Sequence, residues 1–139
     1  MKTGIMKILS TSLVVVFFSV SCNSLTPEQQ KELHEVKILL ENGADVKGEY
    51  ATTALLQASE KGNIEVVKLL LENGADVNTE DKWGMTELMW ASLGGRLDAA
   101  KILLENGADV NAKSKHGKTA LMQAWTHQVK TLLIKHGAK

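Results

Sequence analysis

The sequence predicts an all-α fold in which pairs of helices stack into a solenoid and are joined by hairpin-like loops. Three observations lead to this prediction. The octamer LLENGADV occurs at residues 39–46, 70–77 and 103–110. Similar tetrapeptides, TALL, TELM and TALM, begin 33 residues apart at Thr53, Thr86 and Thr119. Apolar residues recur with helical spacing between these marks, and a constant period of this length is typical of stacked supersecondary units.

The amino terminus differs from the rest of the chain. Lys2 and Lys7 precede an uncharged apolar run, residues 8–21, which is typical of an export signal. The run is shorter than the roughly 20 apolar residues that a membrane-spanning helix needs. We therefore expect residues 1–21 to be a signal peptide.

The end of this run carries the single cysteine of the chain, Cys22. Residues 18–22, FSVSC, resemble the lipobox of bacterial lipoprotein precursors. This resemblance implies that Cys22 is lipidated and becomes the first mature residue, with residues 22–26 as a short tether. The alternative is a simple secretory signal that is cut near Ser21 or Asn23.

The helical units are expected over residues 27–139, beginning with a half unit at residues 27–46. Thr26 and Gln29 have the spacing of a capping box, and Pro27 suits the first position of a helix that runs to Leu40. This helix corresponds to the second helix of a unit. Further units are predicted at residues 47–79 and 80–112, and a shortened one at residues 113–139.

The unit at residues 80–112 shows the pattern most clearly. A short helix is expected from Glu87 to Leu93, followed by a turn at the next two glycines and a second helix that ends at Gly107. In the last unit, Thr119 and Gly137 are 18 residues apart instead of 21, so the glycine turn is lost. We expect His127 and Gln128 to form a tighter bend there. Neighbouring layers must cover each other's leucines, because no unit can bury them alone.

The tetrapeptides and the recurring LLENGADV ending resemble the ankyrin repeat over about residues 27–139. This resemblance implies a non-enzymatic protein–protein interaction module that binds its partner through loop tips and a concave face. The tetrapeptide departs from the family's Thr-Pro-Leu-His. The proline is replaced by Ala or Glu, and the histidine by Leu or Met, at Ala54, Glu87, Ala120, Leu56, Met89 and Met122.

The candidate binding residues lie in three predicted loop tips, GEYAT, DKWGMT and SKHGKT. Tyr50, Trp83 and His116 occupy the same place in successive tips and would form a ladder of ring side chains. The first tip is two residues shorter than the others, and the alternative is that this displaces Tyr50 from the ladder. Aromatic residues on a rigid surface concentrate binding energy. The predicted partner-binding residues are therefore Tyr50, Lys82, Trp83, Met85, Lys115, His116 and Lys118. Alternatively, Trp83 folds over a neighbouring loop and shields the stack. Trp90 and Trp125 are expected to pack.

No pattern in the sequence indicates catalysis or a cofactor. His34, His116, His127 and His136 lack metal-ligand spacing, and we expect them at the surface or at helix caps. The glycines mark helix ends and do not form a phosphate loop. Sixteen basic and sixteen acidic residues give no net charge, which argues against nucleic acid as a partner. We expect no cofactor and no small-molecule substrate.

The resulting functional hypothesis is an exported protein of the bacterial cell envelope, periplasmic or at the surface, that binds another protein and is attached to a membrane by lipid on Cys22. The alternative is a structural or protective accessory protein that stabilises an exported enzyme.

Overall fold

The computed structural model describes residues 25–139. The predicted signal peptide and Cys22 lie outside this range. Seven α-helices and no strands occur in the part of the chain described: α2 (Pro27–Glu41), α3 (Glu49–Lys61), α4 (Ile64–Glu72), α5 (Glu87–Leu93), α6 (Leu97–Glu105), α7 (Ala120–Gln123) and α8 (His127–Lys135). The chain divides into two compact units after Glu32, within α2, and the layers described below belong to the second unit, Leu33–Lys139.

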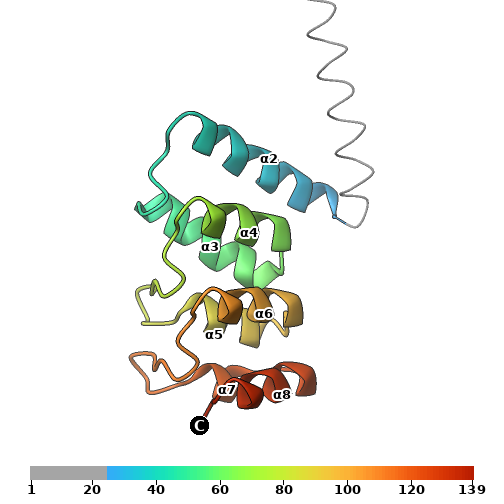
Figure 1. The fold of residues 1–139 in the computed structure, drawn as a ribbon, viewed down its shortest axis with the longest axis vertical. Helices are drawn as coiled ribbons and strands as arrows, with labels where there is room; N and C mark the ends of the chain where they lie inside the picture. Colours follow the sequence, from blue (N-terminus) through green and yellow to red (C-terminus); the bar gives the residue numbers. More distant parts are fainter. Residues whose placement is uncertain (1–24) are drawn as a thin grey trace, which may run out of the picture. The chain divides into compact units, whose positions relative to one another are not determined.

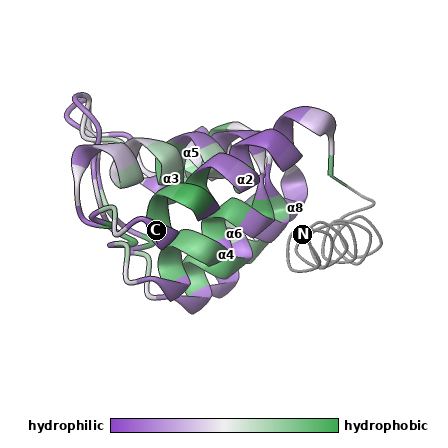
Figure 2. Cartoon of the chain, turned by 90° about the horizontal axis from the view of Figure 1, so that it is seen from above, coloured by the Kyte–Doolittle hydropathy of each residue, from purple (hydrophilic) through white to green (hydrophobic). Residues whose placement is uncertain are grey.

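Three layers of paired helices form a stack (Figure 1). The pairs are α3 with α4, α5 with α6, and α7 with α8, and each first helix packs on the first helix of the next layer. The core repeats with the sequence period, because Leu55 and Leu88 are fully buried at matching positions of α3 and α5. In Figure 2, α4 and α6 are strongly apolar, whereas much of the loop region is polar. The predicted all-α solenoid of stacked helix pairs is therefore confirmed.

The helix ends follow from local sequence signals. At the start of α2, Thr26 N–H donates to Gln29 Oε1 at 2.9 Å, and Gln29 N–H donates to Thr26 Oγ1 at 3.3 Å, which is the predicted capping box. Helix α5 has the predicted bounds, and Thr86 caps it by accepting from Met89 N–H at 3.4 Å. Helix α6 ends before Gly107, whose φ of 91° is accessible to glycine without a steric penalty.

Two local expectations are wrong. Helix α3 begins at Glu49, before Thr53, so the first predicted tip is absent. The bend between the last two helices is formed by residues 124–126, whereas His127 and Gln128 lie in the first turn of α8. The bend can be short because Thr126 caps α8 through Val129 N–H and Trp125 N–H donates to Ser92 O in the layer above, at 3.0 Å.

Candidate functional site

In the loop between α4 and α5, residues 79–86 form a hairpin tip that is organised by Asp81. Glu80 and Thr86 pair as an isolated antiparallel bridge. Asp81 Oδ1 accepts hydrogen bonds from Trp83 N–H at 2.8 Å and from Met85 N–H at 2.9 Å. A carboxylate that accepts from backbone amides in this way fixes the path of the turn. The Asp81 carboxylate therefore fixes the backbone of the tip on which Trp83 lies.

The Trp83 side chain is held between two neighbours. The Lys82 ammonium lies 4.3 Å from the centroid of the Trp83 ring, which is within cation–π range. The Trp90 ring is tilted by 60° with its centroid 6.5 Å away, and Trp90 Nε1–H donates to Asp81 Oδ2 at 2.9 Å. The expectation that Trp90 packs is confirmed. Trp83 itself remains 46% exposed, so a large part of its ring is available to a partner.

The second tip, residues 112–119, repeats this design with a serine. Ser114 N–H donates to Lys118 O at 2.9 Å, and Ser114 Oγ accepts from Lys118 N–H at 3.2 Å. Ser114 thus takes the place that Asp81 has in the first tip. The side chains of Lys115, His116 and Lys118 are exposed around this turn.

The two tips are joined to each other. Lys115 N–H donates to Trp83 O at 3.0 Å, and Lys115 Nζ donates to Lys82 O at 2.7 Å. Gly84 makes this approach possible, because a Cβ there would lie 2.9 Å from Lys115 N and its φ is 72°. Trp83, Lys82 and Lys115 consequently form one continuous surface, which we call the tip surface together with Met85, His116 and Lys118.

Tyr50 lies apart from this pattern. It is the second residue of α3 and is 52% exposed, and its position is in a helix. The structure therefore shows a pair of tips in place of the predicted ladder of three. Met85 is half-buried, whereas Lys82 is exposed.

The supporting residue Asp81 was missed by the sequence interpretation. Its signal was present, since an Asp that precedes Lys-Trp-Gly has the composition of an Asx turn. Trp125 was interpreted wrongly. It was expected to pack, but it is 79% exposed because it lies in the short bend after α7.

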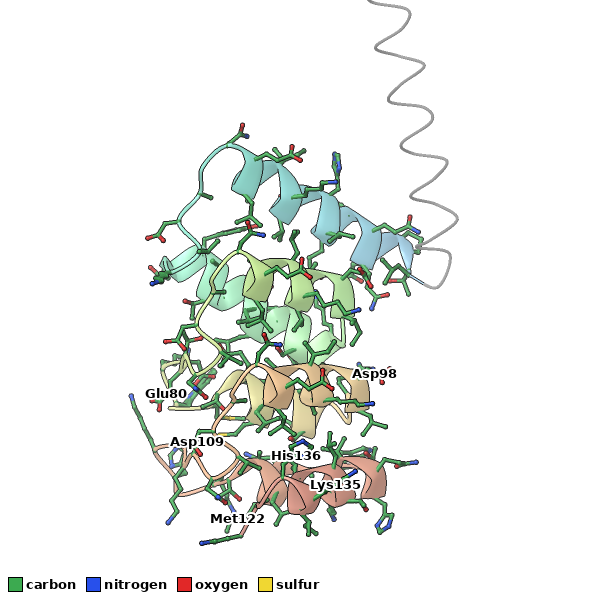
Figure 3. The ribbon with its side chains drawn as sticks, viewed as in Figure 1. Glu80, Asp98, Asp109, Met122, Lys135 and His136 are labelled. Carbon is green, nitrogen blue, oxygen red and sulfur yellow. The ribbon has the colours of Figure 1, made fainter. Side chains whose placement is uncertain are left out.

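Between Leu25 and Lys139 no group of three or more His, Cys, Asp or Glu side chains is placed to hold a metal ion. Over the same range, no helix has both the length and the apolar run needed to cross a bilayer. Glu80, in the first tip, and Asp109, before the second tip, lie on the loop side of the stack (Figure 3).

Two family models match the chain. One, described as ankyrin repeats (3 copies), matches residues 28–81, and the other, ankyrin repeats (many copies), matches residues 70–122. Together they cover more than half of the 139 residues. The chain is an ankyrin-repeat protein. No curated protein shows a significant match to it.

The ankyrin assignment agrees with the layers seen in the structure. The two matches overlap at residues 70–81, which contain the end of α4 and the turn that leads into the first tip. In this ankyrin stack, the loop between α2 and α3 is too short to form a tip. The candidate surface is thus confined to the tips between the three complete layers.

Proposed function

We propose that this ankyrin-repeat chain is a non-enzymatic module that binds a partner protein through its tip surface. The observation that carries the proposal is Trp83, which is half-exposed on a turn that Asp81 holds in place. A rigid aromatic side chain loses little conformational entropy on binding and is a common centre of interface energy. The ankyrin family, whose repeats are protein-interaction modules, supports the same conclusion.

The chemistry of the tips indicates what the partner offers. Lys82 in the first tip and Lys115 and Lys118 in the second tip are exposed. The second tip has no acidic residue between Val110 and Thr119. We therefore propose that the partner segment places an apolar or aromatic side chain on Trp83 and carboxylates beside the lysines. Because the surface consists of only two tips, the interface is at the small end of specific interfaces, below about 800 Å² per side.

From the sequence of residues 8–22, we further propose that the protein is exported and anchored to a membrane through a lipid on Cys22. A lipid on Cys22 would keep the ankyrin layers near a membrane of the cell envelope. Cells fed an alkyne fatty acid should label the full chain, and Cys22→Ala should remove the label. Labelling that survives Cys22→Ala would contradict anchoring at this residue.

The binding proposal is tested by comparing tryptophans. Trp83→Ala should weaken capture of a crosslinked partner by roughly 2 kcal/mol or more, about thirtyfold in Kd, as expected for the centre of an interface. Tyr50→Ala should have a smaller effect, because Tyr50 lies in a helix and outside the tips. The measurement is the amount of partner that the full chain captures from envelope extract. It is followed by titration of each variant with the identified partner to obtain Kd.

The matched control is Trp125→Ala, which also removes an exposed tryptophan but from the bend after α7. This variant should retain capture. Far-UV circular dichroism and urea unfolding should show that both variants are folded. If folded Trp83→Ala captures as much partner as the wild type, the proposal for the tip surface is wrong.

A further inference from the structure

The last described layer, α7 with α8, leaves open the positions that a neighbouring layer covers elsewhere in the stack. Met89 of α5 is fully buried, whereas its equivalent 33 residues later, Met122 of α7, is 65% exposed. Met122 lies on the outer side of this layer, away from α5 (Figure 3). Ile134 of α8 is 60% exposed, and its equivalent in α6, Leu104, is half-buried.

One position on this outer face changes its chemistry as well as its exposure. Helix α8 matches α6 residue by residue with an offset of 30, and α6 matches α4 with an offset of 33. Val67 and Ala100 are equivalent and fully buried, because another layer follows. Their equivalent in α8 is Lys130, which is exposed. The outer face of the last layer thus combines exposed apolar side chains with a lysine.

The charge distribution along the chain makes the α7/α8 layer basic. All 16 acidic residues lie between Glu28 and Asp109. From Val110 to Lys139 the chain contains six lysines, three histidines and no Asp or Glu. A second copy that docked by the same face would bring Lys130 against Lys130 and one lysine-rich layer against another. Like charges placed together at an interface are unfavourable, so charge complementarity selects an acidic occupant.

We propose that the outer face of the α7/α8 layer, formed by Met122, Lys130 and Ile134, binds an acidic amphipathic helix of a partner protein. A helix fits because the interior layers bury the equivalent positions under helices, and helices packed in this way lie about 8–10 Å apart. The apolar side of the incoming helix covers Met122 and Ile134, and a carboxylate pairs with Lys130. This end face is separate from the tip surface and does not require it.

The test uses a fluorescently labelled amphipathic peptide of Leu, Ala and Glu, and a twin in which Lys replaces each Glu. Anisotropy titrations with the full chain should show saturable binding of the Glu peptide, weakened by added salt, and at least tenfold weaker binding of the Lys peptide. Lys130→Glu should reverse this preference. Ile134→Ser should weaken binding of the Glu peptide at least fivefold.

Two control variants separate this face from the rest of the chain. Lys101→Glu places the same charge change on an exposed position of α6 and should alter binding less than twofold. Trp83→Ala should also leave binding of the Glu peptide unchanged. The proposals for the end face and for the tip surface can therefore be contradicted independently of each other.

Three outcomes overturn the proposal. The first is no binding of the Glu peptide, or binding that Lys130→Glu does not affect. The second is binding of the chain to phosphatidylglycerol vesicles through Met122 and Ile134 without peptide binding, which would assign the face to an anionic membrane. The third is a dimer in sedimentation analysis that Ile134→Ser disrupts, which would assign the face to a second copy.

Discussion

At the scale of single residues, Glu87 is the one acidic side chain among residues 25–139 that is buried. It replaces the proline of the family tetrapeptide. Burial raises the pKa of Glu87 from 4.5 to about 8. A hydrogen bond donated by the Thr79 hydroxyl to Glu87 Oε1 opposes this rise, whereas nearby Asp76 and Asp81 add to it. Burial dominates because an ionised carboxylate loses its hydration, and Glu87 Oε2 has no hydrogen-bond partner among residues 25–139.

The raised pKa predicts how stability depends on pH. Between about pH 4.5 and pH 8, the unfolded chain has released the Glu87 proton while the folded chain retains it. Stability contributed by Glu87 is therefore lost as pH rises through this window, by up to about 1.4 kcal/mol per pH unit, and is constant above it. Glu87→Gln removes this term. Urea unfolding at pH 5, 7 and 9 should show that the variant gains stability relative to the wild type as pH rises. Parallel curves would contradict a raised pKa.

Asp81 carries the second prediction at this scale. Its carboxylate accepts three hydrogen bonds, from Trp83 N–H, Met85 N–H and Trp90 Nε1–H. Asp81→Ala leaves these donors without their partner, and we expect a loss of about 1–3 kcal/mol in unfolding free energy and a loosened tip. Asp81→Asn should retain part of this stability, because its amide oxygen still accepts from the backbone. The Trp90 indole N–H resonance in NMR spectra reports the change, and an unshifted resonance in Asp81→Ala would contradict the assigned role.

At the scale of elements, caps and glycine stops predicted helix ends well because these signals act within one turn. The capping box at Thr26 and the bounds of α5 are examples. The sequence shows that the first tip is two residues shorter than the others, but the tetrapeptide at Thr53 did not predict that α3 extends back to Glu49 and replaces this tip. The tip surface was predicted in part. Trp83 could be placed from the period, but its contact with Trp90 depends on a fold that brings the two rings together.

The hydrogen bonds between successive repeats were not predicted from the sequence. Asn78 Nδ2 donates to Gly107 O at 3.2 Å, and Asn78 Oδ1 accepts from Asp109 N–H at 2.8 Å. Asn111 makes the same pair of bonds with Gly137 O and Lys139 N–H. The asparagine that follows the second and third copies of the octamer therefore joins each of these two turns to the turn after it. In sequence it could only be interpreted as a turn residue, because its partners are 26–31 residues away.

The first copy of the octamer is followed by Lys47, so this turn lacks the asparagine. Lys47 N–H donates to Asp45 Oδ1 at 2.9 Å, as Asn78 N–H does to Asp76 Oδ1, so the local turn is the same. Lys47→Asn should add the missing link and raise the unfolding free energy by about 0.5–1.5 kcal/mol.

The converse change is Asn78→Ala, which should lower stability by about 1–3 kcal/mol because it removes an existing link. Urea midpoints of the two variants provide the measurement. If both variants have the same urea midpoint as the wild type, the hydrogen bonds of the asparagines do not contribute to stability.

At the scale of the whole molecule, a stack of three layers is stabilised mainly by contacts between neighbours. The α5/α6 layer has a complete layer on each side, whereas the α7/α8 layer packs on α5 and α6 alone among these layers. Stability in such arrays is approximately a sum of repeat and interface terms. A local defect should therefore have consequences that depend on the layer in which it lies.

Leu103 of α6 and Leu133 of α8 are equivalent and fully buried, which makes them a matched pair. Truncation of either to Ala should cost roughly 2–5 kcal/mol locally. In Leu103→Ala the damage falls on an interior layer, so protection of amides from hydrogen exchange should decrease from α3 to α8. In Leu133→Ala it should decrease mainly in α7 and α8, because the remaining layers keep their own interfaces. Hydrogen-exchange mass spectrometry distinguishes the two patterns. An equal loss of protection in α3 and α4 for both variants would mean that the stack unfolds as one unit, and the additive description of layers would then be wrong.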